Sequence, residues 1–324
     1  MTTKMRSEIA EQPAALRATL DSLLPRIDEV RAVGERTRQL LFIARGTSDN
    51  AAVYGRYLVE SHAGRLAALA APSIATTYKR KLDLDGVLAV AISQSGRTEE
   101  IVETLTWAKD CGAATVGITN GGPDSPLAQA ADVALCTEAG EEKAVPATKT
   151  YTTQLAALAV LALGLGADVD VAELRRVPEA VEKLIAEPGE VAAVVEGLLD
   201  KPGVVVSGRG LAFSTALETA LKLKEACYLH AMGLSYADLL HGPIAVVDAD
   251  TPALLVAAEN SPTLSGTVAL ARAGTAALNG PDLPEWVAPM GLIIPGQLLT
   301  EALARRLGID PDAPRGLNKV TQTD

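Results

Sequence analysis

Residues 87–100 read VLAVAISQSGRTEE, and this stretch decides the expected fold. The apolar, partly β-branched run Val87–Ile92 predicts a buried strand, and the acidic pair after Thr98 is typical of the first turn of a helix. Between them lies a turn of hydroxyl, amide and glycine residues, Ser93–Thr98. A helix N-terminus presents unpaired N–H groups and a positive dipole, so this turn suits an oxyanion such as phosphate. The alternative is an ordinary helix cap, which Ser and Thr also provide.

The same alternation of short apolar runs and helical segments extends through the first half of the chain. Strands are predicted at Leu40–Ala44, Leu66–Ala70, Val87–Ile92, Ala114–Thr119 and Val133–Thr137. Helices are predicted at Asp49–Ser61, Thr98–Asp110, Ser125–Ala130 and, as a buried helix, Leu155–Ala167. This pattern is typical of a parallel sheet covered by helices. We therefore expect a doubly wound α/β domain that ends near Gly166.

A second turn of the same kind follows the first predicted strand, and it contains Thr47 and Ser48. In a doubly wound sheet, the crevice at the carboxyl ends of the strands collects such turns, so both could face one ligand. A plain N-capped turn is the alternative. A further polar stretch, Thr148–Gln154, precedes the buried helix. Its many donors indicate either substrate contacts or a capped and solvated helix start.

The second half of the chain repeats the plan of the first. The predicted strand Val204–Ser207 is followed by Arg209 and Gly210, as the first strand is followed by Arg45 and Gly46. We therefore predict a duplicated α/β unit. Its other predicted elements are strands at Ala253–Ala257, Thr275–Leu278 and Glu285–Ala288, a helix at Leu298–Leu307 and a helical connector, Asp168–Lys201. The polar tail 310–324 contains several turn signals, and composition alone favours disorder there over a path across a site.

The segment 220–241 contains an unusual group of charged residues and two of the three histidines. Lys222 and Glu225 are spaced for one face of a helix, and His241 follows in a Gly-Pro turn. A histidine in that setting is a candidate acid/base group. Lys222 with Glu225 could equally be a solvated ion pair. The other histidines, His62 and His230, are interpreted as ordinary helix residues.

Composition and charge exclude several classes of protein. Lys plus Arg number 29 against 40 for Asp plus Glu, a net charge of −11, and only 3% of residues are aromatic, which argues against nucleic-acid binding. No apolar stretch reaches the roughly 18 residues that a bilayer span requires, and the start of the chain lacks a signal-peptide core. We therefore expect a cytoplasmic protein with no membrane partner.

The cysteines and the known catalytic motifs give no sign of a metal or redox centre. Cys111, Cys136 and Cys227 are too few and too far apart for a disulfide framework or a CxxC site, and we interpret them as small buried hydrophobes. The chain contains no GxSxG, HExxH or GxxxxGK[ST] motif. Phe213 stands where a dinucleotide fingerprint needs its third glycine. No metal and no cofactor are predicted.

Seven segments occur in the order found in one known family. They are Ser7–Pro13, Arg45–Asn50, Ser93–Thr98, Ala147–Leu155, Ala220–Glu225, Leu240–Pro243 and Asp310–Thr321. Together they resemble the sugar isomerase (SIS) family, specifically the isomerase half of glucosamine-6-phosphate synthase and its stand-alone relatives. The resemblance implies an α/β fold of two tandem flavodoxin-like SIS domains, each a parallel sheet flanked by helices. It implies a first, phosphate-binding domain at 1–170 with an N-terminal helix, a helical connector at 171–201, a catalytic domain at 202–309, and a tail at 310–324 over the active site.

The resemblance also implies roles for individual residues. The phosphate would be held by Ser93, Gln94, Ser95 and Thr98, and the sugar would be contacted by Thr47, Ser48 and Val145. Glu225 would move the proton between C1 and C2, with Lys222 in support. His241 would assist ring opening from the neighbouring subunit of a homodimer, and Lys319 would be the tail amine that faces the substrate. The implied partner is a small sugar phosphate.

Differences from the synthase lead us to predict a related activity rather than that of the synthase. The chain begins at the segment that follows the synthase's glutaminase domain and carries Thr2 where that domain has Cys, so we expect no release of ammonia from glutamine. Arg97 replaces the usual Glu of the phosphate loop, and Pro146 stands in a stretch that is normally Val-Ala-Ser/Ala-Thr-Lys. We predict a glucosamine-6-phosphate deaminase that gives fructose 6-phosphate and ammonia. The alternatives are a deglycase, a plain isomerase of another sugar phosphate or, in another class, a non-catalytic phosphosugar sensor.

Overall fold

The computed structural model describes residues 2–257 and 276–319, which divide into two compact units. We call them the first-sheet unit, with residues 15–141 and 150–171, and the second-sheet unit, with residues 2–14, 142–149 and 172–319. The start of the chain and the segment 142–149 therefore group with the second sheet, although both lie in the first half of the sequence.

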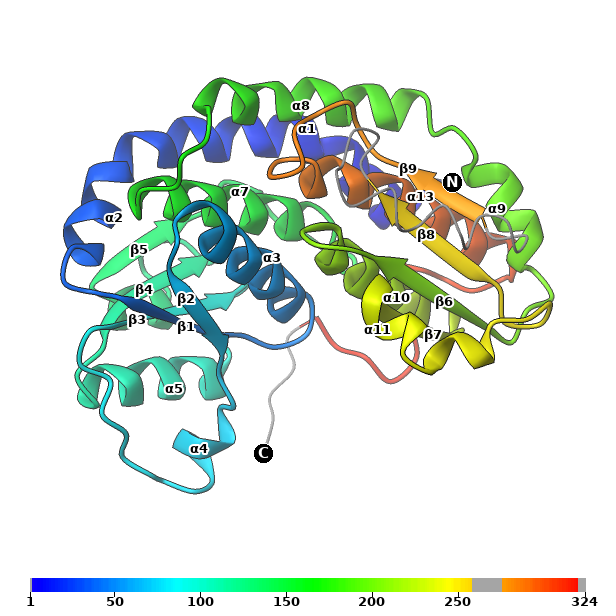
Figure 1. The fold of residues 1–324 in the computed structure, drawn as a ribbon. Coiled ribbons are helices and arrows are strands. Elements are labelled where there is room, and N and C mark those ends of the chain that lie inside the picture. The colour runs from blue at the N-terminus through cyan, green and yellow to red at the C-terminus, as the bar shows by residue number, and fades with distance from the viewer. Residues whose placement is uncertain (1, 258–275, 320–324) are drawn as a thin grey trace. The chain divides into compact units, whose positions relative to one another are not determined.

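The first-sheet unit is built on a five-stranded parallel sheet with strand order β2-β1-β3-β4-β5. Its strands are β1 (Gln39–Ile43), β2 (Leu66–Leu69), β3 (Val87–Ser93), β4 (Ala114–Thr119) and β5 (Val133–Cys136). Its helices are the second half of α1 (Lys4–Leu23), α2 (Ile27–Gly34), α3 (Thr47–His62), α4 (Ser73–Thr76), α5 (Glu99–Asp110), α6 (Pro126–Ala130) and most of α7 (Lys149–Gly164), with a 3-10 turn at Leu24–Arg26. In Figure 1, α5 lies on one face of this sheet, and α3 and α7 lie on the other. All five predicted strands are confirmed to within one residue at each end.

The order of the strands gives this sheet a topological switch point between β1 and β3. β1 and β3 are neighbours, with Ile43 opposite Ala91, and the chain winds outward from them toward β2 on one side and β4 on the other. This is the topological switch point of a doubly wound sheet, where the turns after adjacent strands diverge and leave room for a ligand. β3 is buried from Leu88 to Ser93, which explains its unbroken apolar sequence.

The buried helix that the sequence predicts near residue 155 is α7. The helix is enclosed along its length, and Leu155 and Leu158 are fully buried. Its polar beginning is enclosed as well, because every residue from Thr148 to Gln154 is at most 2% exposed. The solvated helix start considered above is therefore wrong, since these side chains find their partners inside the protein, as Gln154 does by donating to Ser48 Oγ at 3.0 Å.

The second-sheet unit is built on four parallel strands in the order β7-β6-β8-β9. The strands are β6 (Gly203–Gly208), β7 (His230–Ser235), β8 (Ala253–Ala257) and β9 (Ala276–Asn279). The helices are α8 (Val171–Ala186), α9 (Val191–Leu198), α10 (Ala212–Cys227), α11 (Tyr236–Leu240) and α13 (Pro289–Arg306), with a 3-10 turn at Pro243–Val246. α13 packs against α10 and α9, and α10 packs against β6 and β7. The helical structure predicted for Asp168–Lys201 is confirmed by α8 and α9, which group with the second sheet.

Two predictions for this unit are wrong. His230 was expected in a helix but begins β7, because α10 ends at Cys227 and Tyr228 takes a left-handed conformation with φ 56° that turns the chain back along β6. Glu285–Ala288 was expected as a strand but forms a turn that leads into α13 at Pro289, a residue that suits the first turn of a helix. Thr275, the first residue of another predicted strand, lies outside the described residues.

Residues 310–319 of the tail have defined partners, so the disorder favoured by composition is wrong for them. The Asp312 carboxylate accepts hydrogen bonds from the backbone N–H groups of Lys4 at 2.7 Å and Met5 at 2.8 Å, which caps the first turn of α1. Further on, the Arg315 guanidinium stacks on the Tyr228 ring at 4.2 Å, and the Arg315 N–H donates to the Tyr228 hydroxyl at 2.8 Å. Residues 320–324 lie outside the described part.

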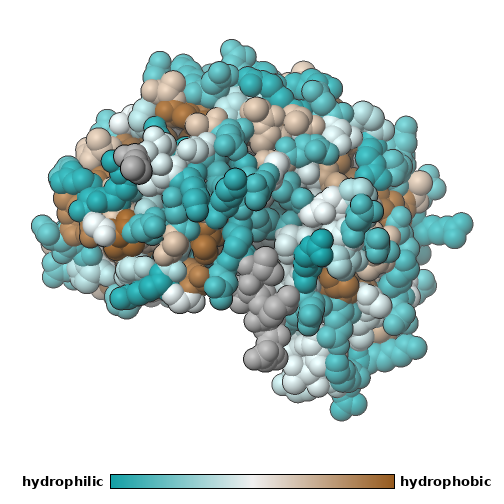
Figure 2. All heavy atoms as spheres, turned by 180° about the vertical axis from the view of Figure 1, so that it is seen from behind, coloured by the Kyte–Doolittle hydropathy of each residue, from teal (hydrophilic) through white to brown (hydrophobic). Residues whose placement is uncertain are grey.

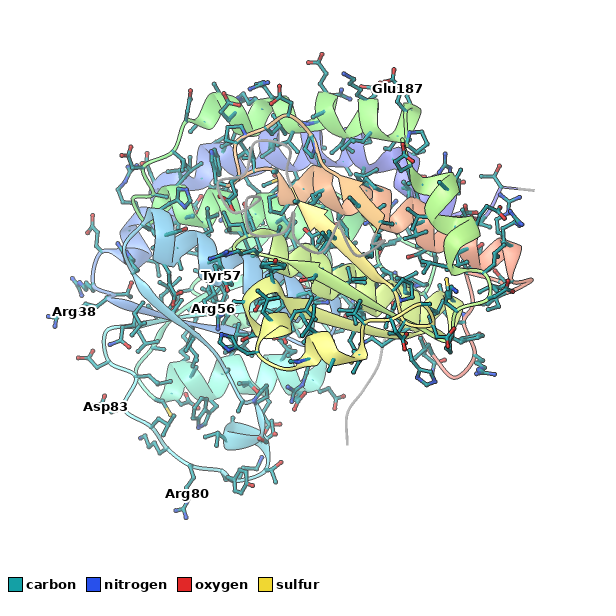
Figure 3. All side chains as sticks on the ribbon, turned by 45° about the vertical axis from the view of Figure 1, so that its right-hand side comes forward. Arg38, Arg56, Tyr57, Arg80, Asp83 and Glu187 are labelled. Carbon is teal, nitrogen blue, oxygen red and sulfur yellow. The ribbon has the colours of Figure 1, made fainter. Side chains whose placement is uncertain are left out.

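The face drawn in Figure 2 is mainly hydrophilic, and apolar side chains reach it in separate areas. Figure 3 shows Arg80 and Asp83 projecting outward from the loop that joins α4 to β3. Within the described ranges, none of the helices is both long enough and apolar enough to cross a membrane.

Candidate functional site

The hydroxyl-rich turn that follows β3 lies at the N-terminus of α5. Thr98 occupies the N-cap position in an extended conformation, but its side chain makes no capping hydrogen bond. Instead its hydroxyl lies 3.3 Å from that of Ser93, and the Arg97 N–H donates to Ser95 Oγ at 3.2 Å. The cap alternative is therefore not supported for Thr98. The turn offers neutral hydroxyls beside a helix N-terminus, the arrangement that binds oxyanions.

Gly96 fixes the shape of this turn. Its φ of +63° is in the left-handed region, and an added Cβ would lie 2.6 Å from Ser125 Oγ and 2.7 Å from Thr119 Oγ1. The Gln94 carbonyl next to it accepts a hydrogen bond from the Asn120 N–H at 3.0 Å. The backbone of the turn is thus held by the β4 side of the sheet, independently of any ligand.

The structure brings the turn after β1 next to the turn after β3, as predicted for the switch point. The Arg45 guanidinium makes two hydrogen bonds of 2.9 Å to the carboxylate of Glu100, in the first turn of α5. Thr47 and Ser48 form the first turn of α3 rather than a loop, since that helix begins earlier than expected. Ser48 is buried, whereas Thr47 is half-buried.

In the second-sheet unit, a row of charged side chains lies on one face of α10. Lys222 Nζ is 3.4 Å from Glu218 Oε1 and 2.5 Å from Glu225 Oε2. Lys222 and Glu218 are buried, whereas the Glu225 side chain is 23% exposed. The solvated ion pair considered from the spacing is therefore wrong, because the ammonium lies inside the protein. Within this row, the Glu225 carboxylate is the group that reaches water.

The neighbours of Lys222 determine its charge. Burial works to lower the pKa of Lys222, but the carboxylates of Glu218, Glu225 and Glu142 outweigh burial and raise the pKa above its ordinary value. Lys222 therefore stays an ammonium near neutral pH. It can orient Glu225 through a charged hydrogen bond.

The tail amine has a partner that the sequence did not indicate. Lys319 Nζ donates to Glu142 Oε2 at 2.9 Å and to the Ala144 carbonyl at 2.7 Å. The Glu142 side chain is fully buried, and its other oxygen accepts the Thr148 N–H at 2.8 Å. Val145, the predicted sugar contact in this segment, donates its N–H to the Asp312 carbonyl at 3.1 Å.

A second buried carboxylate, Glu8 on α1, supports the same segment. It accepts hydrogen bonds from the backbone N–H groups of Lys143 and Ala144. Burial raises the pKa of Glu8, and the nearby Glu142 adds to this, while the two N–H groups and Lys319 oppose it. Glu8 of α1 and the tail thus both bind the first residues of the segment 142–149, Glu8 at Lys143 and Ala144 and the tail at Glu142, Ala144 and Val145.

The predicted site residues fall into two groups, one in each unit. Those for phosphate and sugar, except Val145, lie around the two turns of the first sheet, while Lys222, Glu225 and Lys319 lie in the second-sheet unit. His241 is exposed at the end of α11, and its imidazole has no hydrogen-bond or ion-pair partner among the described residues. His62 ends α3 as predicted.

Sequence reasoning missed Glu142 and Glu218. Glu218 could have been found, because it lies one helical turn before Lys222 and so shares its face. Glu142 gave no such signal, since its partner Lys319 is far away in the chain.

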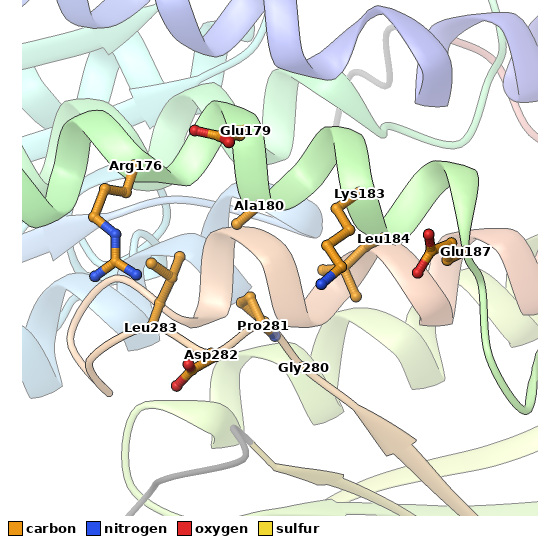
Figure 4. Close-up of a pocket in the computed structure, with 10 residues that line it drawn as sticks. All are labelled: Arg176, Glu179, Ala180, Lys183, Leu184, Glu187, Gly280, Pro281, Asp282 and Leu283. Atoms are coloured by element: carbon orange, nitrogen blue, oxygen red, sulfur yellow. The ribbon is translucent and has the colours of Figure 1, made fainter.

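The structure also contains a pocket remote in sequence from these residues. A cavity of about 450 Å³ lies between α8 and the segment after β9, and Arg176, Lys183 and Asp282 are among its lining residues (Figure 4). It contains none of the predicted site residues. Among the described residues, no group of three or more His, Cys, Asp or Glu side chains is placed to hold a metal ion.

Comparison with known proteins places the chain in a family. The SIS domain model matches residues 35–164, which include every strand of the first sheet. Over 97% of its length the chain is 34% identical to glutamine–fructose-6-phosphate aminotransferase (isomerizing) of Pyrococcus horikoshii, and it spans 57% of that protein. The chain thus spans little more than half the length of this curated relative.

Two solved structures have a similar fold. The C-terminal domain of glucosamine-fructose-6-phosphate aminotransferase from Francisella tularensis matches with a TM-score of 0.87 and 30% identity, over 97% of this chain and 99% of that one. Glucosamine-6-phosphate deaminase from Thermotoga maritima matches with a TM-score of 0.77 over 99% of this chain and 100% of that one; at 24% identity, this shows the fold alone. On the family model and on the identity to a fully spanned domain, the chain belongs to the SIS domain family.

Proposed function

We propose that the chain is an aldose/ketose isomerase of phosphorylated sugars with amine chemistry at C2, and specifically a glucosamine-6-phosphate deaminase. One observation carries the proposal: the buried Lys222 ammonium holds the partly exposed carboxylate of Glu225. Isomerisation through an enediol or enolamine needs such a fixed carboxylate base beside two sugar carbons. The names of the aminotransferases from Pyrococcus horikoshii and Francisella tularensis support the substrate class, because both names contain fructose 6-phosphate.

In the proposed reaction, His241 assists opening of the sugar ring. Glu225 then removes the proton from C2 of the open aldose, and the C1 aldehyde oxygen takes up a proton. Return of a proton to C1, with loss of one from nitrogen, leaves an alcohol at C1 and an imine at C2. Water adds to C2 and ammonia leaves, which gives fructose 6-phosphate. Lys222 orients the base, and the Lys319 amine stabilises charge that develops on oxygen.

The turns of the first sheet are proposed to bind the phosphate. Ser93, Ser95 and Thr98 supply hydroxyl donors beside the N-terminus of α5, where the helix dipole favours an anion. Gln94 adds an amide, and Thr47 with its neighbour Ser48 is proposed to contact the sugar. The fixed backbone around Gly96 supports this role, because a preformed turn loses little entropy on binding.

We further propose that the enzyme is a homodimer whose subunits exchange His241. The imidazole has no partner in its own chain among the described residues, and it is exposed. Three large apolar side chains of the same β7–α11 region are also exposed: Met232 by 40%, Leu240 by 50% and Val246 by 43%. A second subunit that covers this apolar area would bury it and bring the histidine to a neighbouring site. The tandem SIS arrangement, with domains at 1–170 and 202–309, is part of the same proposal.

A panel of sugar phosphates tests the proposal and separates it from its alternatives. The purified protein is incubated with glucosamine 6-phosphate, its epimers, amine-substituted fructose 6-phosphates and unaminated aldose phosphates, and ketose phosphate and ammonia are measured together. Equal amounts of ketose phosphate and ammonia from glucosamine 6-phosphate support the deaminase. Turnover confined to substituted amines indicates a deglycase, and ketose without ammonia indicates a plain isomerase. Binding without turnover of any sugar would identify a sensor and overturn the proposal.

A further inference from the structure

We propose that Glu142 is the positioning residue of the tail amine: its buried carboxylate holds Lys319 in place before any sugar binds. The inference deepens the proposed function, on which its catalytic consequence rests. The structural part stands on the contacts of Glu142, which lie within the second-sheet unit.

The Glu142 carboxylate is fixed independently of the tail. Its Oε1 atom accepts hydrogen bonds from the Thr148 N–H at 2.8 Å and from the Thr148 hydroxyl at 3.3 Å. Both donors belong to its own segment, and that segment is held in turn by Glu8 of α1. The Oε2 atom is directed to Lys319. Oε1 therefore fixes the orientation of the carboxylate through Thr148, and Oε2 binds the Lys319 amine.

The Lys319 amine is held at two points and still has an open side. Besides Glu142, the Ala144 carbonyl accepts a hydrogen bond from it at 2.7 Å. The Lys319 side chain is 24% exposed, whereas that of Glu142 is fully buried. A charge-assisted hydrogen bond to a buried carboxylate is stronger than one at the surface, because water does not compete for the carboxylate. The amine therefore has a fixed position and a face that a ligand can approach.

Glu142 also acts on the charge row of α10. Its negative charge is among those that keep Lys222 protonated. The same carboxylate thus stabilises two ammonium groups, one in α10 and one in the tail. Because the Lys319 amine is already in position, no conformational entropy is lost in placing it during the reaction. Its contribution should therefore appear in kcat rather than in KM.

The first test uses trypsin and needs no activity. Trypsin must take the lysine side chain into its own pocket to cleave after Lys319, so it competes with Glu142 for that ammonium. In Glu142→Gln, the amide can still accept from Thr148 but lacks the charge. Cleavage after Lys319, followed by mass spectrometry of the released peptide 320–324, should accelerate about tenfold, the value of one charge-assisted hydrogen bond. Cleavage after Arg315 serves as the internal reference and should keep its rate.

Matched variants control for a general loosening of the segment. Glu11→Gln removes another carboxylate that contacts this segment, the partner of Lys149. Glu11 is 54% exposed and does not contact Lys319, so cleavage after Lys319 and after Arg315 should both keep the wild-type rate. Glu142→Asp keeps the charge on a shorter side chain and should recover part of the protection. An unchanged rate of cleavage after Lys319 in a folded Glu142→Gln variant would overturn the proposal.

The second test is kinetic and uses the substrate found active in the panel above. Glu142→Gln should lower kcat about tenfold or more with KM changed less than twofold, and the double variant with Lys319→Gln should turn over no more slowly than Lys319→Gln alone. Additive losses, or a normal kcat, would show that the amine is not positioned by Glu142 for catalysis. A wild-type protein inactive on every sugar would refute the proposed function, while the trypsin result would still decide the role of Glu142.

Discussion

The turns after β1 and β3 and the charged face of α10 lie in two copies of the same strand–turn–helix plan, yet they carry opposite kinds of groups. The turns present neutral hydroxyls at helix N-termini, where the backbone itself supplies positive potential. Lys222 lies in the last two turns of α10, where no such potential exists, and its charge is balanced by carboxylates instead. Under the proposed function, the difference teaches that phosphate binding relies on backbone geometry, whereas proton transfer relies on buried side-chain charges that compensate one another.

The largest expected effect tests whether the α10 face carries the chemistry. Glu225→Gln keeps the size and hydrogen bonding of the side chain but removes its basicity, so kcat should fall by about 10² to 10⁴ while the sugar phosphate still binds. Turnover and binding are measured separately, and wild-type product should carry solvent deuterium at C1. Lys224→Gln, an exposed neighbour on the same helix, serves as control and should behave like the wild type. Full activity of Glu225→Gln would remove α10 from the chemistry.

The next effect concerns the stability of the charge row. Lys222→Met removes the cation that faces the fully buried Glu218. Loss of the cation from such a buried pair should lower the free energy of unfolding by about 3 to 5 kcal/mol. Chemical denaturation measures the loss. The double variant Lys222→Met/Glu218→Gln should recover much of it, because the buried carboxylate is then gone as well. A single variant as stable as the wild type would show that these charges do not depend on each other.

A smaller effect is expected at the turns of the first sheet. Ser95→Ala removes one hydroxyl proposed to bind the phosphate, which should weaken binding by about 1.5 to 3 kcal/mol and raise KM with little change in kcat. Ser61→Ala, at an exposed hydroxyl near the end of α3, is the matched control. If KM for the phosphorylated substrate stays the same in Ser95→Ala, the neutral turn is not the binding element and the contrast with α10 fails.

The smallest effect is a difference in pH dependence between the two units. Burial raises the pKa of Glu8 in the second-sheet unit, so the folded state binds its proton more tightly and this group favours folding more as pH falls from 7 toward about 4. For Asp132 in the first-sheet unit, partial burial is outweighed by Lys109 and Thr115, which lower its pKa. Its contribution is present above the unfolded pKa and is lost as pH falls below about 4.

The variants Glu8→Gln and Asp132→Asn check this difference by denaturation at several pH values. The advantage of the wild type over Glu8→Gln should grow on acidification, whereas its advantage over Asp132→Asn should shrink. Curves that run in the same direction for both variants would contradict the assigned pKa shifts.

The sequence was informative where one local pattern decides the structure. The strands of the first sheet are continuous apolar runs, and the turn at Ser93–Thr98 follows one of them directly. β7 was missed because HAMGLS shows neither alternation nor β-branched residues, and its place in the sheet depends on pairing with β6. The burial of Lys222 and its contact with Glu218 result from the packing of α10, which spacing alone does not specify.

The contact between Glu142 and Lys319 was beyond sequence reasoning for a different reason. It joins segments 177 residues apart, and no periodicity connects them. The family resemblance did predict a tail over a site, but composition pointed to disorder, because polar residues with several turn signals look alike whether they are free or docked.

The cap that Asp312 forms on α1 has a consequence for how the protein is made. The two ends of this contact are 308 residues apart, so α1 receives this carboxylate only after the ribosome has synthesised the strands of both sheets and residue 312. A chain that stops before residue 312 keeps both sheets in its sequence, but at the start of α1 it keeps the Thr3 hydroxyl, which accepts the Arg6 N–H at 3.0 Å, without the Asp312 carboxylate. Docking of Asp312 therefore distinguishes a chain synthesised beyond residue 312 from one interrupted before it, and it does so at the same tail that carries Lys319.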